Sequence, residues 1–296
     1  MSERLNLLKL HNQLKRPLIL DGAMGSLLID KGVISHPLLW TALSNINNPD
    51  LVKNIHYEYI KSGAEIIITN TFRTNPYVIN KSNMNINTND IVKKAIEIAF
   101  ESRGEKEIII AGSNAPAEDC YQRERTISYK ELEYNHKTHI DILWENNVDI
   151  IWNETQSHKD EIEIICNHCY KNKIPFVVSL FFDEDLKILS GEYLYDIVEY
   201  INSFEPAAIG FNCIKPSAFI KYIEKYSLPP RWGFYFNCGA GNYNDENIVC
   251  GISPENYVNI VKSLLDLKPI FVGTCCGSNP SHIKAIKDLF NEIYRN

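Results

Sequence analysis

The chain has 296 residues, of which 45% are hydrophobic, so it can bury a substantial core as one large domain or two small ones. Its formal net charge is -7 and it contains no basic run, which disfavours a nucleic acid or an anionic membrane as a partner. No apolar stretch approaches the ~20 residues of a membrane span, and the polar N-terminus lacks a signal-peptide core. We therefore expect a cytoplasmic protein whose cysteines are reduced thiols or metal ligands.

Short apolar runs alternate with helical patterns along the chain, after an amphipathic helix predicted over residues 1–15. Eight runs are typical of strands, at residues 18–20, 65–69, 107–111, 149–152, 176–180, 207–211, 233–236 and 270–272. Helical spacing predicts helices at residues 50–61, 89–103, 129–147, 158–171, 193–203, 217–226, 255–266 and 281–294. An asparagine-rich segment, residues 80–89, is predicted to be a loop.

Three of the predicted helices carry recognisable start signals. Ser128 with Glu131 and Ser157 with Asp160 each have the spacing of a capping box. Ser253 precedes a proline at the first helical turn, where the missing N–H group costs nothing. We expect these helices to begin at the three serines.

Continuous apolar strands that alternate with helices indicate parallel strands buried on both faces. Eight such units over this length predict a (β/α)₈ TIM barrel, formed by residues 1–296 as a single domain. The alternative is a doubly wound open sheet with a glycine-rich dinucleotide turn after the first strand. Residues 21–26 read DGAMGS, which is not the G-x-G-x-x-G of that turn. The sequence therefore favours the barrel.

Catalytic groups of a (β/α)₈ barrel lie at the C-terminal ends of its strands. Seven of the predicted strands here end in polar or sulfur-containing side chains, at Asp21, residues 69–72, 112–114, 153–155, 212–213, 237–238 and 275–276. A purely structural core has little use for so many polar groups at equivalent points. These strand ends are therefore the predicted site.

Three cysteines at strand ends form a candidate zinc site. Cys275 and Cys276 are adjacent between Gly273 and Gly277, which permit a sharp turn, and Cys213 ends a strand two positions earlier in the predicted barrel. Zinc binds thiolates, and a catalytic site keeps one coordination position open for water or substrate. The alternative is three buried thiols that act as small apolar side chains.

Three soft thiolates would suit a site that also holds a sulfur-containing substrate. A free thiol has a pKa near ~8.5 and is mostly protonated at neutral pH, whereas a thiol bound to zinc loses its proton. The remaining cysteines are weaker candidates as ligands. Cys166 and Cys169 fall inside a helical pattern with no second pair nearby, so we interpret them as structural.

Two acids and two aromatic residues near strand ends are candidates for substrate contacts. Asp21 and Glu154 could hold a substrate ammonium group by charge-assisted hydrogen bonds, or could instead cap helices. Trp40 and Phe72 could face a positively charged donor through cation–π contacts, or could belong to the core.

Five segments together resemble the homocysteine S-methyltransferase family: residues 21–26 (DGAMGS), 39–72 (LWTALSNINNPDLVKNIHYEYIKSGAEIIITNTF), 152–155 (WNET), 210–213 (GFNC) and 273–277 (GTCCG). The family includes betaine-dependent enzymes, enzymes that use S-methylmethionine or S-adenosylmethionine, and the homocysteine module of cobalamin-dependent methionine synthase. The resemblance extends from about residue 18 to residue 294, and the motifs are highly specific when taken together.

The resemblance implies a (β/α)₈ barrel in which Cys213, Cys275 and Cys276 hold a catalytic Zn²⁺. It also implies that Asp21 and Glu154 bind homocysteine. The second-strand motif of the family matches the chain at residues 69–72, which makes Thr71 and Phe72 further substrate-binding candidates.

The seventh strand departs from the family pattern. In some members an asparagine after this strand occupies the fourth zinc position when substrate is absent, and Asn237 is its nearest match. The family usually reads Pro-Asn-Ala-Gly there, whereas this chain reads FNCGAG over residues 236–241. The family also usually has Gly-Gly before its cysteine pair, where this chain has Gly273 and a threonine.

The implied function is zinc-dependent methyl transfer from a sulfonium donor to the thiol of homocysteine, giving methionine. We expect S-methylmethionine or S-adenosylmethionine as the donor, because the chain has no room for folate, cobalamin or activation modules and lacks the C-terminal extension of betaine enzymes. The alternatives are a barrel that uses betaine or a separate corrinoid or folate protein, and a non-catalytic zinc- or thiol-binding barrel. A zinc hydrolase is disfavoured, since no cluster of histidines and carboxylates lies at the strand ends.

Overall fold

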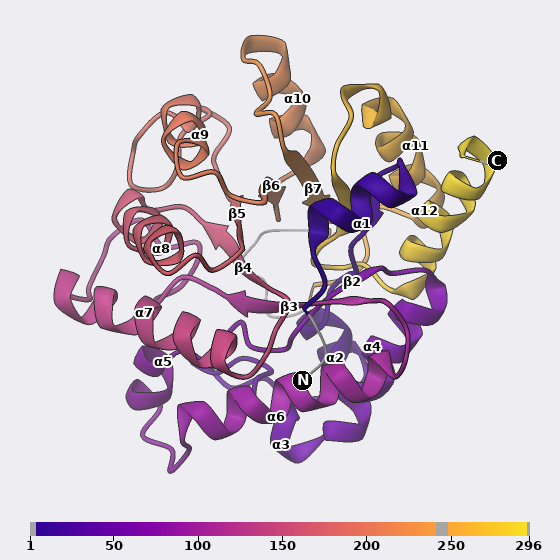
Figure 1. Cartoon of the computed structure of the whole chain (residues 1–296). Coiled ribbons are helices and arrows are strands. Elements are labelled where there is room, and N and C mark those ends of the chain that lie inside the picture. The colour runs from indigo at the N-terminus through magenta and orange to yellow at the C-terminus, as the bar shows by residue number, and fades with distance from the viewer. Residues whose placement is uncertain (1–3, 241–247, 295–296) are drawn as a thin grey trace.

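The computed structural model describes residues 4–240 and 248–294 (Figure 1). Their strands form an eight-stranded parallel sheet in the order β1-β8-β7-β6-β5-β4-β3-β2. The strands are β1 (Leu18–Ile19), β2 (Ile66–Ile68), β3 (Ile109–Asn114), β4 (Ile150–Gln156), β5 (Phe176–Leu180), β6 (Ala208–Asn212), β7 (Trp232–Phe236) and β8 (Phe271–Thr274). A parallel bridge between Leu20 and Ile66 joins β1 to β2 and closes the barrel. The predicted (β/α)₈ barrel is therefore confirmed.

Helices surround the strands, as Figure 1 shows in a view along the barrel. They are α1 (Leu7–Leu14), α2 (Gly25–Asp30), α3 (Ser44–Asn47), α4 (Pro49–Ser62), α5 (Pro76–Lys81), α6 (Thr88–Arg103), α7 (Tyr129–Glu145), α8 (Lys159–Lys171), α9 (Leu194–Asn202), α10 (Pro216–Lys225), α11 (Pro254–Leu264), the 3₁₀ turn η1 (Leu265–Leu267) and α12 (Pro280–Ile293). Residues 1–3 of the helix expected at 1–15, and Gly241 of the 236–241 segment, lie outside the described residues.

Side chains that alternate along each strand fill two separate cores. Ile110 and Ile151 face outward and pack under the helices, whereas Trp152 and Phe271 point into the barrel, with ring centroids 4.7 Å apart. Leu7 of α1 packs in the same inner core, so α1 covers the N-terminal end of the barrel. The strands can be apolar throughout because both of their faces are buried.

The start signals are confirmed at two of three helices. Ser128 and Glu131 form the reciprocal capping box of α7, and Ser253 caps α11. The capping box expected at Ser157 is wrong, because His158 precedes α8 and Ser157 Oγ instead donates to Phe181 O at 2.8 Å. The β4-to-α8 loop is therefore tied to the neighbouring strand rather than to its own helix.

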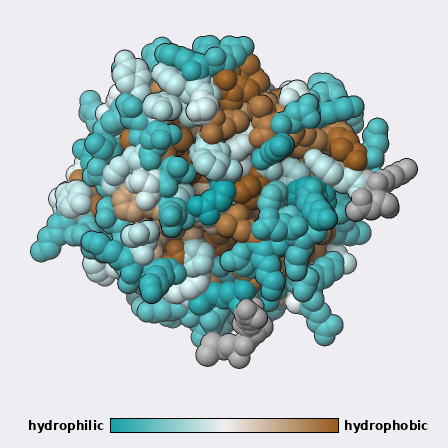
Figure 2. Space-filling view, turned by 45° about the horizontal axis from the view of Figure 1, so that its top comes forward, coloured by the Kyte–Doolittle hydropathy of each residue, from teal (hydrophilic) through white to brown (hydrophobic). Residues whose placement is uncertain are grey.

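Three short helices, α2, α3 and α5, were not predicted, and all three lie in the loops that follow β1 and β2. They thicken the C-terminal side of the barrel, where the predicted site residues lie. The outer surface seen in Figure 2 is largely hydrophilic with smaller apolar patches. Within the described residues, no helix has the length and apolar character needed to cross a membrane.

Candidate metal and substrate site

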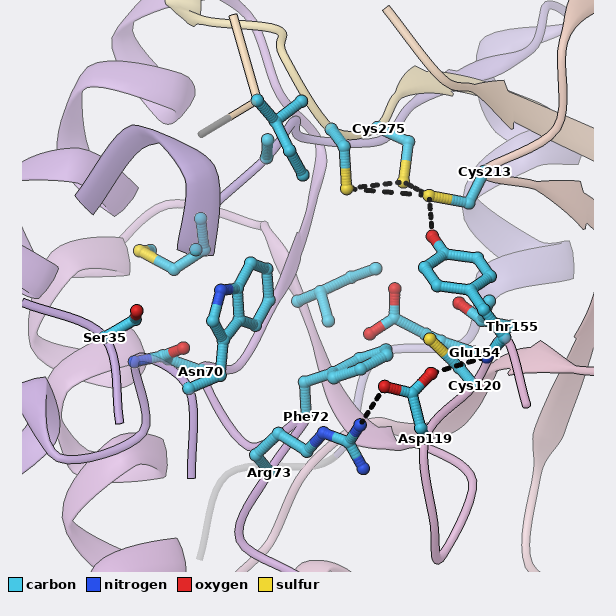
Figure 3. Close-up of a pocket in the computed structure, with 18 of the residues that line it drawn as sticks. Ser35, Asn70, Phe72, Arg73, Asp119, Cys120, Glu154, Thr155, Cys213 and Cys275 are labelled. Carbon is cyan, nitrogen blue, oxygen red and sulfur yellow. Dashed lines mark hydrogen bonds and ion pairs between the residues drawn. The ribbon is translucent and has the colours of Figure 1, made fainter. Parts of the chain in front are cut away.

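Three thiols meet at the C-terminal ends of β6 and β8 (Figure 3). The Sγ atom of Cys213 lies 3.0 Å from that of Cys275 and 3.5 Å from that of Cys276, and the two neighbouring sulfurs are 3.9 Å apart. Within the described chain, this is the one group of three or more histidine, cysteine or acidic residues arranged closely enough to hold an ion. The topology therefore brings together thiols that are 62 residues apart in sequence.

The spacing of the three sulfurs fits a tetrahedral zinc site. Four ligands at about 2.3 Å from a zinc ion are separated from one another by about 3.8 Å, and the observed separations of 3.0 to 3.9 Å surround that value. A disulfide would need about 2.05 Å, so no pair here is bonded. All three cysteines are free thiols. The donor set is therefore soft, compact and suited to Zn²⁺.

The backbone around the thiols is held in unusual conformations. Cys213 has a φ of 56°, in the left-handed region that few non-glycine residues adopt. Gly277 has a φ of 80°, and a Cβ atom there would lie 2.6 Å from the Cα of Gly239. The expectation that Gly273 also permits the turn is wrong. This residue lies within β8, where a Cβ would lie 2.7 Å from the Cβ of Leu20, so its small size lets β1 pack closely.

Hydrogen bonds to the sulfur of Cys213 favour its thiolate form. The thiols of Cys275 and Cys276 and the hydroxyl of Tyr121, 3.3 Å away, lower the pKa of the Cys213 thiol well below its ordinary value. Tyr121 comes from the loop after β3. The loop after β3 therefore contacts the three cysteines through Tyr121, and the sequence pattern did not predict this contact.

Two buried acids lie in the same pocket as the thiols. Asp21 follows β1, and its Oδ2 accepts a hydrogen bond from Ile68 N at 2.9 Å. Burial raises its pKa well above the usual value, and the nearby Glu154 adds to this effect. Both acids line the pocket, as expected from their positions at strand ends.

Glu154 lies within β4 and is held by two hydroxyl groups. Ser113 Oγ donates to its Oε1 at 2.5 Å, and the hydroxyl of Tyr235 lies 3.4 Å from its Oε2. Burial, reinforced by the charge of Cys213, raises the pKa of Glu154 to about 7. Neither acid caps a helix. Two carboxyl groups that are costly to ionise therefore face the same cavity as the three thiols.

The pocket has a volume of about 900 Å³ and lies at the C-terminal end of the barrel. Trp40 and Phe72 line it with their rings in an edge-to-face arrangement, 6.0 Å between centroids. Trp40 packs so closely on Gly25 that a Cβ there would lie 2.2 Å from the indole. Both aromatic residues are half-buried pocket walls rather than core.

Two of the predicted residues do not line the pocket and instead form local hydrogen bonds. Thr71 is fully buried and does not line the pocket, and its hydroxyl donates to Ser113 O at 2.8 Å. It therefore contacts the segment that carries Ser113 rather than the cavity. The Oδ1 of Asn237 accepts a hydrogen bond from Gly239 N at 2.6 Å, so this amide is engaged in its own turn.

Several pocket residues lie in loops that have no periodic sequence pattern. Cys120, Tyr121 and Asp119 follow β3 in a segment without helical or strand periodicity. Arg73 also lines the pocket and comes directly after the 69–72 segment. Its position at the end of a predicted strand is the one feature of the sequence that could have assigned it to the site. The interpretation of Cys166 and Cys169 as structural is confirmed, because both are buried in α8 away from the pocket.

Known proteins of one family match this chain over nearly all of its length. The family model described as homocysteine S-methyltransferase matches residues 18–290. Homocysteine S-methyltransferase 1 of Arabidopsis thaliana is 23% identical, over 90% of this chain and 91% of the relative. Selenocysteine Se-methyltransferase of Brassica oleracea var. italica is also 23% identical, over 90% of this chain and 87% of the relative.

A solved structure agrees with the fold. The metallated form of the homocysteine methyltransferase MmuM from Escherichia coli superposes with a TM-score of 0.78 at 21% identity, covering 96% of this chain and 100% of the other. The barrel, the motifs at its strand ends and the family match over residues 18–290 lead to the same conclusion. The chain belongs to the homocysteine S-methyltransferase family and is a methyltransferase of the EC 2.1.1 class.

Proposed function

We propose that residues 1–296 act as one homocysteine-binding barrel that transfers a methyl group from S-methylmethionine or S-adenosylmethionine to homocysteine, giving methionine. The observation that carries the proposal is the meeting of Cys213, Cys275 and Cys276, with sulfur separations of 3.0 to 3.9 Å, inside the pocket that also holds two buried acids. A soft metal site suits a thiol acceptor, and a thiolate is a suitable nucleophile for a cationic methyl donor.

Cys213, Cys275 and Cys276 are the proposed ligands of a zinc ion. When bound, zinc lowers the pKa of a coordinated thiol, so that homocysteine is held as a thiolate at neutral pH. The fourth ligand in the absence of substrate stays a prediction. Asn237 is the candidate from the resemblance, and its Oδ1 accepts a hydrogen bond from Gly239 N.

Asp21 and Glu154 are the proposed partners of the homocysteine ammonium group. Both carboxyl groups are buried, and their raised pKa values mean that ionisation is costly without a cation nearby. An ammonium group would supply that cation and would form charge-assisted hydrogen bonds with both. The Ser113 hydroxyl keeps Glu154 oriented for this contact.

Trp40 and Phe72 are the proposed walls for the sulfonium group of the donor. A cation over an aromatic ring is stabilised by about 0.5 to 2 kcal/mol, and more in a site with little water. During transfer the donor's sulfur–methyl bond breaks, and its electron pair stays on the donor sulfur, which leaves as a neutral thioether. The new bond forms between the methyl carbon and the homocysteine sulfur, whose proton has gone to solvent.

The proposal is tested by assaying the zinc-loaded protein with homocysteine and each candidate donor in turn. We expect methionine from S-methylmethionine or S-adenosylmethionine, and loss of both bound zinc and turnover in Cys275→Ser. A Cys166→Ser variant serves as the matched control, since its thiol is buried outside the pocket. Turnover with betaine alone would contradict the sulfonium donor.

Two other outcomes would favour the alternatives. Activity that appears only when a corrinoid or folate protein is added would indicate a separate carrier of the methyl group. Failure to form methionine with any donor, despite stoichiometric zinc, would favour a non-catalytic zinc- or thiol-binding barrel.

A further inference from the structure

A cation and an anion lie together at the edge of the pocket, away from the thiols. Arg73 follows β2 and Asp119 lies in the loop after β3, and both line the pocket. In Figure 3 the two side chains lie across the pocket from Cys213 and Cys275. The pocket therefore has a sulfur end and a charged end.

The Arg73 guanidinium is fixed in place but keeps donors available. Its Nη1 donates to Glu118 O at 2.6 Å, and it lies 5.8 Å from the centre of the Phe72 ring. Its Nη2 is 4.0 Å from Asp119 Oδ2, which is longer than a hydrogen bond. A guanidinium has five N–H donors in a rigid plane, so most of them remain free for a ligand carboxylate. The side chain is only 13% exposed, so such a contact would be little screened by water.

Asp119 is held beside Arg73 by the backbone. Its Oδ1 accepts a hydrogen bond from Tyr121 N at 2.8 Å, which leaves Oδ2 toward the arginine. The side chain is 57% exposed, so it can exchange water for a ligand at small cost. A fixed cation next to a fixed anion matches the paired carboxylate and ammonium of an α-amino acid.

We propose that Arg73 and Asp119 form a subsite for the amino-acid head of the methyl donor, with Arg73 binding its carboxylate and Asp119 its ammonium group. This inference rests on the proposed function, because it assumes a sulfonium donor in this pocket. Asp21 and Glu154 serve the acceptor at the sulfur end, and Phe72 lies beside Arg73. The donor class is then a zwitterionic amino-acid sulfonium.

The subsite distinguishes donors by their charges. Betaine carries a carboxylate, but its one ammonium group is quaternary, has no N–H to donate and is itself the methyl-donating centre, so betaine would leave Asp119 without a hydrogen-bonding partner. After transfer the donor leaves as a neutral amino-acid thioether that still carries both head-group charges. Arg73 and Asp119 therefore contribute binding to donor and product alike, and their removal should raise the KM for the donor more than it lowers kcat.

The test compares three sulfonium donors of equal chain length on the zinc-loaded protein: S-methylmethionine, an analogue without the ammonium group and an analogue without the carboxylate. In the wild-type protein we expect each analogue to have a kcat/KM about 10- to 100-fold lower than S-methylmethionine, as for the loss of one charged hydrogen-bonded pair. Arg73→Gln should reduce use of the two donors that carry a carboxylate and leave the third unchanged. Asp119→Asn should reduce use of the two that carry an ammonium group.

Two controls distinguish donor binding by Arg73 and Asp119 from a purely structural role in the loop after β3. Arg123→Ala removes a charge from the same loop, where Arg123 is 61% exposed and pairs with Asp183 at 3.0 Å, so donor KM should not change. Zinc content and the KM for homocysteine should stay at wild-type values in the Arg73 and Asp119 variants.

Three results would overturn the proposed subsite, and they have different consequences for the proposed function. Equal use of all three donors by the wild-type protein would remove the subsite and leave the proposed function intact. An equal loss with all three donors in Arg73→Gln, accompanied by loss of zinc, would show that Arg73 only supports the loop. No turnover with any of the three, or with S-adenosylmethionine in the same assay, would overturn the sulfonium donor itself, and the subsite with it.

Discussion

At the scale of single residues, the site places ionisable groups where burial changes their behaviour. Glu154 is enclosed by β3, β4 and β7, and its pKa of about 7 follows from burial, with a further rise from the charge of Cys213 and an opposing effect from the Ser113 hydroxyl. A carboxyl group with this pKa is neutral below pH 7 and ionised above it. Its ability to hold an ammonium group should therefore change within the physiological range.

This leads to a prediction for Glu154→Gln. In the wild-type protein, kcat/KM for homocysteine should rise with pH up to about 7 as Glu154 ionises. The variant should lose about 10- to 100-fold in kcat/KM and should lack this rise, because an amide has no charge to gain. The measurement is a pH profile of kcat/KM for both proteins. An unchanged rise in the variant would assign the titration to another group.

At the scale of elements, the turn after β8 sets the direction of two thiols. Gly277 adopts a φ of 80°, and Cys276 O accepts a hydrogen bond from Cys238 N at 2.8 Å. The turn is thus packed directly against the chain that follows β7. A side chain at residue 277 would disturb both the backbone conformation and this packing.

We predict that Gly277→Ala weakens zinc binding by at least about tenfold, since small displacements of metal ligands and their supports typically cost 10- to 100-fold. The matched control is Gly104→Ala, where φ is also positive at 56° but no atom lies within 4 Å of the added Cβ. The control should lose about 1 to 3 kcal/mol of stability and keep its zinc. Zinc titration against a competing chelator compares the two, and equal affinity would contradict the role assigned to this turn.

The loop that carries Tyr121 and Asp119 is anchored by a buried acid. Glu161 in α8 accepts hydrogen bonds at its Oε1 from Ala117 N at 2.8 Å and from His136 at 3.1 Å, and it lies 3.3 Å from Arg125. Although burial alone raises its pKa, contacts with His136 and Arg125 lower it to about 2. This network lies outside the pocket, so it stabilises the loop without contacting substrate.

Glu161→Gln should destabilise the protein by about 3 kcal/mol, because it removes the buried charge that pairs with both His136 and Arg125. The native pKa is depressed below the value of about 4.3 in the unfolded chain, so the stabilisation is fully present above pH 4.3 and is lost as pH falls toward 2. The wild-type and variant stabilities should therefore converge at low pH. Glu133→Gln, an exposed partner of Lys137, should cost less than about 0.5 kcal/mol. Urea unfolding at several pH values measures all of these.

The elements also show what the sequence could and could not predict. All eight strands were found, because strands buried on both faces are continuous apolar runs such as 176–180. The meeting of Cys213 with the later pair followed from the rule that parallel strands of a barrel end on one side. Arg73 and Asp119 were missed, because their pairing depends on the paths of two loops with no periodic pattern. Asn237 and Thr71 were placed by resemblance, and their local hydrogen bonds could be seen only in three dimensions.

At the scale of the whole molecule, the metal site joins distant parts of the barrel. Cys213 follows β6 and the pair follows β8, so a bound ion would link two strands that have β7 between them. An ion that binds the folded but not the unfolded chain stabilises it by about 4 kcal/mol at a concentration 1,000 times its dissociation constant. The stability of the barrel should therefore depend on metal loading.

We predict that removal of zinc by a chelator lowers the Tm of the wild-type protein by roughly 10 °C. The loss of about 4 kcal/mol of stabilisation is multiplied by the shift of about 2 to 4 °C per kcal/mol that is typical of large domains. Cys213→Ser should have a lower Tm that the chelator no longer changes. Calorimetry or circular dichroism with and without chelator makes the comparison. A wild-type Tm that is indifferent to the chelator would indicate that the trio does not bind a metal in the folded state.

The most direct test of the account is X-ray absorption spectroscopy at the zinc edge, on the zinc-loaded protein before and after addition of homocysteine. We predict one zinc per chain with three sulfur ligands and one oxygen or nitrogen ligand, and replacement of that fourth ligand by sulfur when homocysteine binds. Fewer than three sulfur ligands, or a coordination shell that homocysteine leaves unchanged, would contradict it.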